Sequence, residues 1–373
     1  MIRLKNIALA LILFTLLAYS FAFASDTRVL TMGDANSFVI DEANIFLYPH
    51  MLQKYAKLVN AEYRSGSDFA SIGGNFPLSD GADPKVIGVY FYENSPIYFG
   101  LGSTNQPQIG GMVLPNQRIS ILYGQNFGGT PYGVGLNYIS ASEKGDTTSL
   151  ERSNFELDLL FSSEITTQLE VAAGISFWNF KDINAADSEL VKTSGNLYYT
   201  LYGRYWMAQS GQMMPVLHLD FSNMKETIDD VDYTDLMFSL GIGMNYNTQQ
   251  NALLVGDFGF MYASEKQSAA GADIKSTYAA LPYFKAGVEA DLFKWMDFRA
   301  GVTSYWNSQK DENVEKYSYV NTSTYLGAGF HWGKLDIDAQ LAPQFLRNGP
   351  YFISGVSTGG GLASRISLIY WLN

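Results

Sequence analysis

The stretch from Gln168 to Phe180, QLEVAAGISFWNF, alternates between two kinds of side chain along its whole length. In a β-strand, successive side chains point to opposite faces. One face of this strand would carry Leu169, Val171, Ala173, Ile175 and Phe177, and the other Glu170, Ala172, Gly174, Ser176 and Trp178. The apolar face could pack on a protein core or face lipid, and the rest of the chain decides between the two.

The same alternation recurs through the chain, for example in NFELDLLF (154–161) and DFRAGVTSYW (297–306). It predicts about sixteen strands, or fourteen if the first two, which have the weakest pattern, do not form. The expected ranges are 57–64, 68–77, 85–94, 118–127, 132–143, 151–164, 168–181, 193–208, 213–226, 233–247, 252–265, 277–293, 296–309, 317–332, 335–346 and 363–372.

The connections between these strands alternate between short and long. Tight reversals are expected at 162–168, 208–213, 247–251, 292–297 and 331–334. Long polar loops are expected at 140–149, 181–194, 223–233, 263–277, 307–318 and 347–363. Short turns on one side and long loops on the other are typical of transmembrane β-barrels. The sequence therefore predicts an all-β, antiparallel transmembrane barrel, with the apolar face of 168–180 toward lipid and Glu170 toward the lumen.

Composition agrees with a barrel wall between two environments. Charged residues are 16% of the chain, against about 25% in typical soluble domains, and aromatic residues are 15%. The formal net charge is -12, which argues against nucleic acid as a partner because phosphate binding needs a basic face. With 0 Cys, the chain has neither disulfides nor thiolate metal sites.

The six tryptophans are placed near the ends of the expected strands. Trp178 and Trp306 fall near the long-loop ends, and Trp206, Trp295, Trp332 and Trp371 near the short-turn ends. Trp is enriched at both interfaces of a membrane. By strict alternation, however, Trp178, Trp206 and Trp371 would point inward, so only part of the set fits an aromatic girdle.

The N-terminus has the pattern of a secretory signal peptide. Arg3 and Lys5 precede an apolar run that ends in Ala22-Phe23-Ala24, and such a segment is removed on export; an uncleaved anchor is the alternative. We expect a signal peptide at 1–24, a plug at 25–56 and the barrel at 57–373, in the outer membrane of a Gram-negative-type bacterium.

Residues 26–56 do not alternate, and part of this segment resembles a known family. Its pattern, Arg-x-x-x-Met-Gly-x-Ala, then an acidic residue, then x-Pro-x-x-Leu, is similar to the N-terminal signature of the long-chain fatty-acid transporter (FadL-like) barrels. The related type IX secretion (PorV-like) barrels share it. The matching residues are Arg28, Met32, Gly33, Ala35, Asp41, Pro49 and Leu52. The resemblance implies a segment that plugs the lumen, either as a fixed structural element or as a moving gate.

Strand alternation also predicts the charged residues of the lumen. The expected ligand or lumen residues are Glu156, Asp158, Glu170, Arg204, His218, Asp220, Asp257, Lys285, Glu289, Arg299, Asp336 and Asp338, and Asp291 is expected to face inward with them. A water-filled acidic lumen would favour cations. The alternative is that these charges pair across the barrel.

Other chemistries find little support. His218 and Asp220 could form the base end of a hydrolase triad, but no Gly-x-Ser-x-Gly elbow supplies a nucleophile. The acidic loop with Glu226, Asp229, Asp230 and Asp232 fits no defined calcium loop, and Asp336-Ile337-Asp338 is discounted as a calcium site in the same way. The glycine-rich 357–364 lacks a phosphate-loop lysine. We expect no enzyme, no metal site and no cofactor.

Three functions remain open for such a barrel. The leading hypothesis is FadL-like passive or ligand-gated uptake of a small hydrophobic solute, with Phe352 and Ile353 in a capture surface. The second is a PorV-like barrel that binds a secreted protein. The third is a cation-leaning general porin, for which the uncharged stretch 95–117 is the longest candidate for an inward-folded loop. Membrane lipids are the expected surroundings in each case, and the oligomeric state stays open.

Overall fold

The structure is a computed structural model, and it describes residues 26–64, 70–79, 81, 83–91, 117–144, 151–183, 189–208, 212–228, 231–248, 251–269, 272–311, 316–341 and 363–372. The signal-peptide segment, Asp229, Asp230, the stretch 95–116 and the loop with Phe352 and Ile353 lie outside these residues. None of the described helices is long and apolar enough to cross a membrane.

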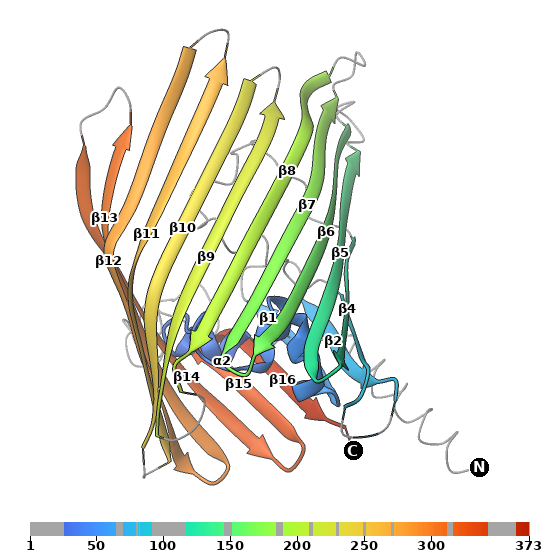
Figure 1. The fold of residues 1–373 in the computed structure, drawn as a ribbon, viewed down its shortest axis with the longest axis vertical. Helices are drawn as coiled ribbons and strands as arrows, with labels where there is room; N and C mark the ends of the chain where they lie inside the picture. The colour runs from blue at the N-terminus through green and yellow to red at the C-terminus, as the bar shows by residue number, and fades with distance from the viewer. Residues whose placement is uncertain are drawn as a thin grey trace, which may run out of the picture.

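Sixteen antiparallel strands close into one barrel (Figure 1). They are β1 (Leu58–Arg64), β2 (Ser71–Pro77), β3 (Val86–Phe91), β4 (Gln117–Phe127), β5 (Thr130–Lys144), β6 (Glu151–Thr166), β7 (Leu169–Ile183), β8 (Glu189–Trp206), β9 (Met213–Ile228), β10 (Val231–Asn247), β11 (Ala252–Ala269), β12 (Ala272–Phe293), β13 (Met296–Asp311), β14 (Tyr317–Trp332), β15 (Leu335–Leu341) and β16 (Ala363–Trp371). Each strand pairs with its sequence neighbour, and β1 pairs with β16 from Leu58↔Trp371 to Arg64↔Arg365. The predicted fold class is confirmed. The barrel has sixteen strands and not fourteen, so the first two strands, whose sequence pattern was the weakest, do form.

Two of the predicted long loops, 223–233 and 263–277, are wrong, because strands include all but two residues of each. β9 runs to Ile228 and β10 begins at Val231, while β11 runs to Ala269 and β12 begins at Ala272. Polar residues continue these ladders because their side chains also pair across the strands: Thr227 Oγ1 donates to Asp232 Oδ1 over 2.7 Å. The polar composition of these segments predicted loops. Antiparallel strands that have water on both faces still form their backbone hydrogen bonds, and they tolerate polar side chains on both faces.

The outer face of the barrel is apolar, as the alternation predicted. Phe177 is 43% exposed, whereas Glu170 on the same strand is 1% exposed. The same division holds around the wall, where the exposed large side chains include Leu159, Phe161, Leu201, Ile242, Leu254, Phe258 and Phe284. Soluble proteins rarely expose so large an apolar surface. The apolar face of 168–180 therefore lies on the outside of the barrel, as predicted.

Exposed tryptophans mark two levels of this surface. Trp295, in the β12–β13 turn, and Trp306, on β13, are both exposed and lie 11 positions apart. An outer-membrane strand needs about 9–11 tilted residues to cross the bilayer, so the two rings have the spacing of two membrane interfaces. Trp206 is fully buried on the inner side, and Trp371 reaches the inward-facing Asp336 through its indole N–H.

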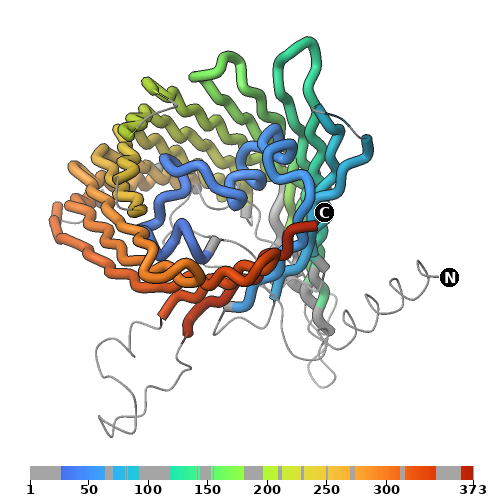
Figure 2. The backbone as a smooth tube through the Cα atoms, turned by 90° about the horizontal axis from the view of Figure 1, so that it is seen from below, coloured from blue at the N-terminus to red at the C-terminus, as the bar shows by residue number. Residues whose placement is uncertain are grey.

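Residues 26–56 lie inside the barrel at the end that carries the short turns (Figure 2). This plug contains α2 (Asp26–Thr31) and the 3-10 helices η1 (Glu42–Phe46) and η2 (Pro49–Tyr55). A reciprocal capping box between Asp41 and Asn44 begins η1, and Pro49 takes the first position of η2, where its missing N–H costs nothing. The plug runs directly into β1.

Candidate functional site

The plug fits against glycines on the inner wall. A Cβ added at Gly287 would lie 2.2 Å from Met32 O, and one at Gly301 would lie 2.1 Å from Gly33 N. On the opposite side, a Cβ at Gly133 would lie 2.2 Å from the carbonyl carbon of Pro49. Any larger residue at these positions would displace the plug or the wall, so the sequence of the wall is adapted to this segment.

Two apolar clusters extend this fit. Met32, Ala35, Phe38 and Val39 of the plug pack with Trp206, Val216 and Val255 of the wall. Ile45, Phe46, Tyr48, Met51 and Leu52 pack with Val86, Tyr90, Leu122, Leu160, Ala172 and Tyr202. The core of this protein therefore lies inside the bore and is shared between plug and wall.

A first ion-pair network joins α2 to β12 and β13. Arg28 pairs with Asp41 of the plug at 2.5 Å and with Glu289 of the wall at 2.7 Å. Burial alone lowers the pKa of Arg28, but the carboxylates of Asp41 and Glu289 more than reverse this and hold its pKa above the usual value. Glu289 is shared with Arg299, whose Nε lies 2.5 Å from it.

The network continues around the wall to the closing strand. Arg299 also pairs with Asp338 and, at 3.4 Å, with Asp297. His331 contacts Asp297 and Asp336, each at 2.7 Å, and the indole N–H of Trp371 donates to Asp336 over 2.6 Å. Buried charges are tolerated where each has a partner, and this chain of contacts satisfies that condition from the plug to β16.

A second network surrounds Arg204 of β8, which is 1% exposed. Arg204 pairs with Glu170 of β7 and donates to Asn44 Oδ1 of the plug over 3.1 Å. Its guanidinium carbon lies 4.3 Å from the centre of the Tyr48 ring. Trp206 donates to the same oxygen of Glu170, Oε2, over 3.2 Å. One wall arginine therefore holds both 3-10 helices of the plug.

A third group lies under Asp34. Lys285 Nζ lies 2.9 Å from Asp34 Oδ2 and donates to the backbone carbonyl of the same residue over 3.0 Å. His218 stacks on Phe38 of the plug and places Nε2 3.0 Å from Asp257, whereas its Nδ1 is 3.9 Å from Asp220. The carboxylate closest to His218 is thus that of Asp257, and not that of Asp220, the partner that the sequence suggested.

The twelve predicted lumen residues all lie on the inner side of their strands. The structure brings most of them to the plug in these three networks, and it leaves Glu156 and Asp158 higher on β6, toward the loops. Asp291, which was also expected to face inward, pairs in register with the inward-facing Asp297 of β13 and interacts with its side chain, and it is exposed because it lies next to the β12–β13 turn. The predicted plug residues Arg28, Met32, Gly33, Asp41, Pro49 and Leu52 lie in the seated segment.

Besides Asp297, which pairs with Arg299 and His331 in the first network, sequence reasoning missed three buried carboxyl groups as lumen residues. Glu62 of β1 accepts a hydrogen bond from Thr27 and lies 3.6 Å from Arg365. Glu226 of β9 and Asp235 of β10 are buried on the loop side of the bore. Alternation could have found all three, but Glu226 was read as part of an acidic loop and β1 as a weak strand.

No family model and no curated protein match this sequence. Among solved structures, a FadL homologue from Pseudomonas aeruginosa has a TM-score of 0.45 and 10% identity, covering 95% of this chain and 100% of that one. The outer-membrane OmpT of Vibrio cholerae has a TM-score of 0.35 and 14% identity, covering 74% and 95%. CdiB from Acinetobacter baumannii has a TM-score of 0.45 and 10% identity, covering 84% and 59%. These likenesses concern barrel architecture and do not distinguish a FadL-like protein from other outer-membrane barrels.

Proposed function

We propose that this chain is an outer-membrane barrel that admits a small solute under the control of its plug. The observation that carries the proposal is the seating of residues 26–56 across one end of the bore. The plug takes no strand position in the barrel. The contacts that hold it are side-chain hydrogen bonds, ion pairs and apolar packing, which can break one at a time while the barrel stays closed.

The apolar exterior supports the membrane location in this proposal. The band of exposed apolar residues and the Trp295–Trp306 spacing match the apolar belt of outer-membrane barrels, which is about 25 Å tall. The direct test is electrophoresis of the folded chain with and without heating. A closed barrel in detergent migrates differently before and after heating, and a chain that sediments as a soluble monomer without detergent would contradict the membrane location.

The described wall above the plug favours a polar solute. Its buried inward residues include the polar or acidic Ser120, Asn137, Asp158, Ser176, Thr200 and Ser222, and also the apolar Ile139, Met237 and the cluster of Trp178, Tyr198 and Met224. Polar and acidic linings select cations and hydrated solutes. The hydrophobic solute that the family resemblance implies stays a prediction, and this wall gives it less support.

Conductance in a planar bilayer tests the control by the plug. The mature chain should be silent or nearly so, and a variant without residues 26–56 should conduct steadily. If the intact chain already conducts at the level of the truncated one, the plug does not control passage and the proposal fails.

A reversible tether separates a moving gate from a fixed plug. A Cβ at Gly124 would lie 3.1 Å from the Cβ of Leu52, a few tenths of an ångström short of the range of about 3.5–4.5 Å found in disulfides. The chain has 0 Cys, so the double variant Leu52→Cys, Gly124→Cys would form one defined bond. A moving gate loses solute uptake on oxidation and regains it on reduction, and each single variant serves as a control.

A protein-binding role is the second candidate, and the height of the wall favours it. β12 has 22 residues and continues nine positions beyond Leu281, which lies near the level of Trp306, to Ala272. This extension is paired with β11 up to Ala269, and it would stand outside the membrane as a firm surface. A truncated chain that folds but does not conduct would favour this role over solute passage.

A further inference from the structure

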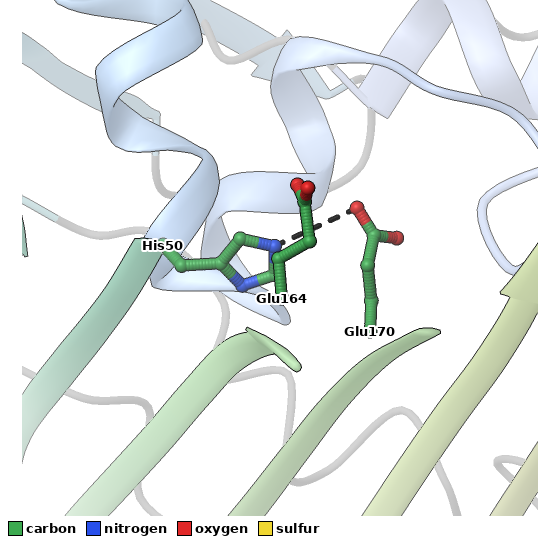
Figure 3. A group of neighbouring side chains, drawn as sticks. All are labelled: His50, Glu164 and Glu170. Atoms are coloured by element: carbon green, nitrogen blue, oxygen red, sulfur yellow. Dashed lines mark ion pairs between the residues drawn. The ribbon is translucent and has the colours of Figure 1, made fainter. Parts of the chain in front are cut away.

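Three side chains from the plug and one wall hairpin converge near the short-turn end (Figure 3). They are His50 of η2, Glu164 of β6 and Glu170 of β7, and one ligand atom from each lies within 4.8 Å of the others. His50 Nε2 lies 3.5 Å from Glu170 Oε1. Imidazole nitrogen and carboxylate oxygen are the ligands that zinc accepts in proteins besides thiolate.

The Nε2 atom of His50 makes no hydrogen bond of normal length among the described residues, and its nearest partner is Glu170 Oε1 at 3.5 Å. His50 is 1% exposed, and its Nε2 is buried and unsatisfied among the described residues. Its other ring nitrogen, Nδ1, lies 3.0 Å from Ser162 Oγ, which also accepts the backbone N–H of His50. In the tautomer that donates Nδ1–H to Ser162, the lone pair of Nε2 points toward two carboxylates, an arrangement that calls for a cation between them.

Glu170 is oriented in the same way by neighbours on its far side. Arg204 and Trp206 both donate to Oε2, which leaves Oε1 directed at His50. Metal ligands in proteins are commonly fixed by such outer partners. Ser162 and Arg204 thus hold the two buried ligands before any ion arrives.

We propose that His50, Glu164 and Glu170 bind a divalent transition-metal ion of the zinc class, which fastens the plug to the β6–β7 hairpin. With bonds of about 2.0–2.1 Å, the ligand atoms of a tetrahedral zinc ion are separated by roughly 3.4 Å. The distance of 3.5 Å between His50 Nε2 and Glu170 Oε1 already meets that value. Glu164 stands near the end of its strand with a side chain 17% exposed, so it closes by rotation and water takes the fourth position.

Lys54 occupies the place of this ion in the structure. Its Nζ lies 3.6 Å from Glu164 Oε2 and 3.9 Å from Glu170 Oε1, and its side chain is 46% exposed. Lys54 also borders a cavity of about 300 Å³ that Gln53, Lys57 and Trp371 help to line. The ammonium group can swing into this space and give the ion a path from solvent, so lysine and metal compete for the two carboxylates.

Calorimetric titration of the full mature chain in detergent with Zn²⁺ tests the site. One equivalent should bind, Mg²⁺ should not, and Glu164→Gln should weaken Zn²⁺ binding by at least about tenfold. Lys54→Met should tighten it, since the competing charge is gone, whereas the control Lys294→Met, at an exposed position that does not line this cavity, should leave it unchanged. A gain of affinity in Lys54→Met does not arise from misfolding.

Two results would overturn the site. One is absence of stoichiometric Zn²⁺ binding by both the natural chain and Lys54→Met. The other is equal affinity of the natural chain, Glu164→Gln and His50→Gln, which would place the ion elsewhere. Because binding is measured directly, the site stands or falls whether or not the plug controls passage.

Discussion

In the short-turn half of the bore, Arg204, Lys285 and Arg299 each contact a carboxylate of the plug or of a neighbouring strand. In the loop-side half, Glu226 has both carboxylate oxygens buried without a hydrogen-bond partner among the described residues, and Asp235 has one. The same wall thus pairs its charged groups where it holds the plug, and on the loop side it carries buried acidic groups with oxygens that have no hydrogen-bond partner among the described residues. The first arrangement stabilises a seated segment, and the second offers acidic groups whose pKa is raised by burial.

Removal of Arg204 should have the largest effect on this difference. Arg204→Ala leaves Glu170 buried without its main partner and frees Asn44 and Tyr48 of the plug. Loss of one member of a buried ion pair costs about 3–5 kcal/mol. We expect the plug to be cleaved by added protease while the barrel stays resistant. Lys57→Ala, at an exposed position, is the control, and equal resistance of both variants would show that Arg204 does not hold the plug.

The glycine seat gives the next largest effect and has a matched control in the adjacent strand. Gly287→Ala places a methyl group 2.2 Å from Met32 O, whereas the nearest atom to a Cβ at Gly256 of β11 is 3.9 Å away. Overpacking costs about 1–3 kcal/mol. Gly287→Ala should lower the denaturant midpoint for plug release and raise conductance, and Gly256→Ala should do neither. Similar behaviour of the two variants would mean that the close fit is relieved elsewhere.

Glu42 allows a smaller, pH-dependent test within the plug. Burial, and then the charge of Asp41, raises the pKa of Glu42 well above its usual value. Between the ordinary and the raised pKa, the folded state binds a proton that the unfolded state has lost, so the free energy of unfolding falls as pH rises. Glu42→Gln should therefore be more stable than the natural chain at neutral pH, and the gain should vanish below the ordinary pKa. Denaturant midpoints of the variant and the natural chain, measured across this pH range, test the predicted gain in stability. A gain that persists at low pH would mean that it does not come from the protonation of Glu42.

The loop-side acids should affect selectivity more than stability. Burial raises the pKa of Glu226 to about 8 and that of Asp235 to about 7, so both are fully ionised only at alkaline pH. In the chain without residues 26–56, the double variant Glu226→Gln, Asp235→Asn should therefore lose part of its cation preference at alkaline pH, seen as a shift of the reversal potential in a salt gradient. Asp291→Asn changes an exposed carboxylate at the other end of the barrel and should shift it least. Equal shifts in the two variants would place the selecting charge elsewhere.

The alternation of side chains along the strands predicted most of the fold, because a residue of a barrel strand faces either the inside or the outside of the barrel. It placed Glu170 inward and Phe177 outward correctly. The prediction failed at 223–233 and 263–277, where loops were predicted from the polar composition alone. Strands with water on both faces have a polar composition like that of loops. Partners inside the bore could not be predicted from the alternation, because whether His218 meets Asp220 or Asp257 depends on registers across β9, β10 and β11. His50, Glu164 and Glu170 likewise come together only through the seating of the plug.

The seam between β1 and β16 bears on how the molecule is assembled. Leu58 pairs with Trp371, and the backbone N–H of Leu372 donates to the carbonyl of Lys57, so the barrel closes between its two most distant strands in sequence. Such non-local pairing is slow to form. Glu62, beside this seam, contacts Thr27 of the plug and Arg365 of the last strand. Glu62 therefore links the plug to both strands of the seam, so the pairing between the first and last strands is supported by a segment that belongs to neither.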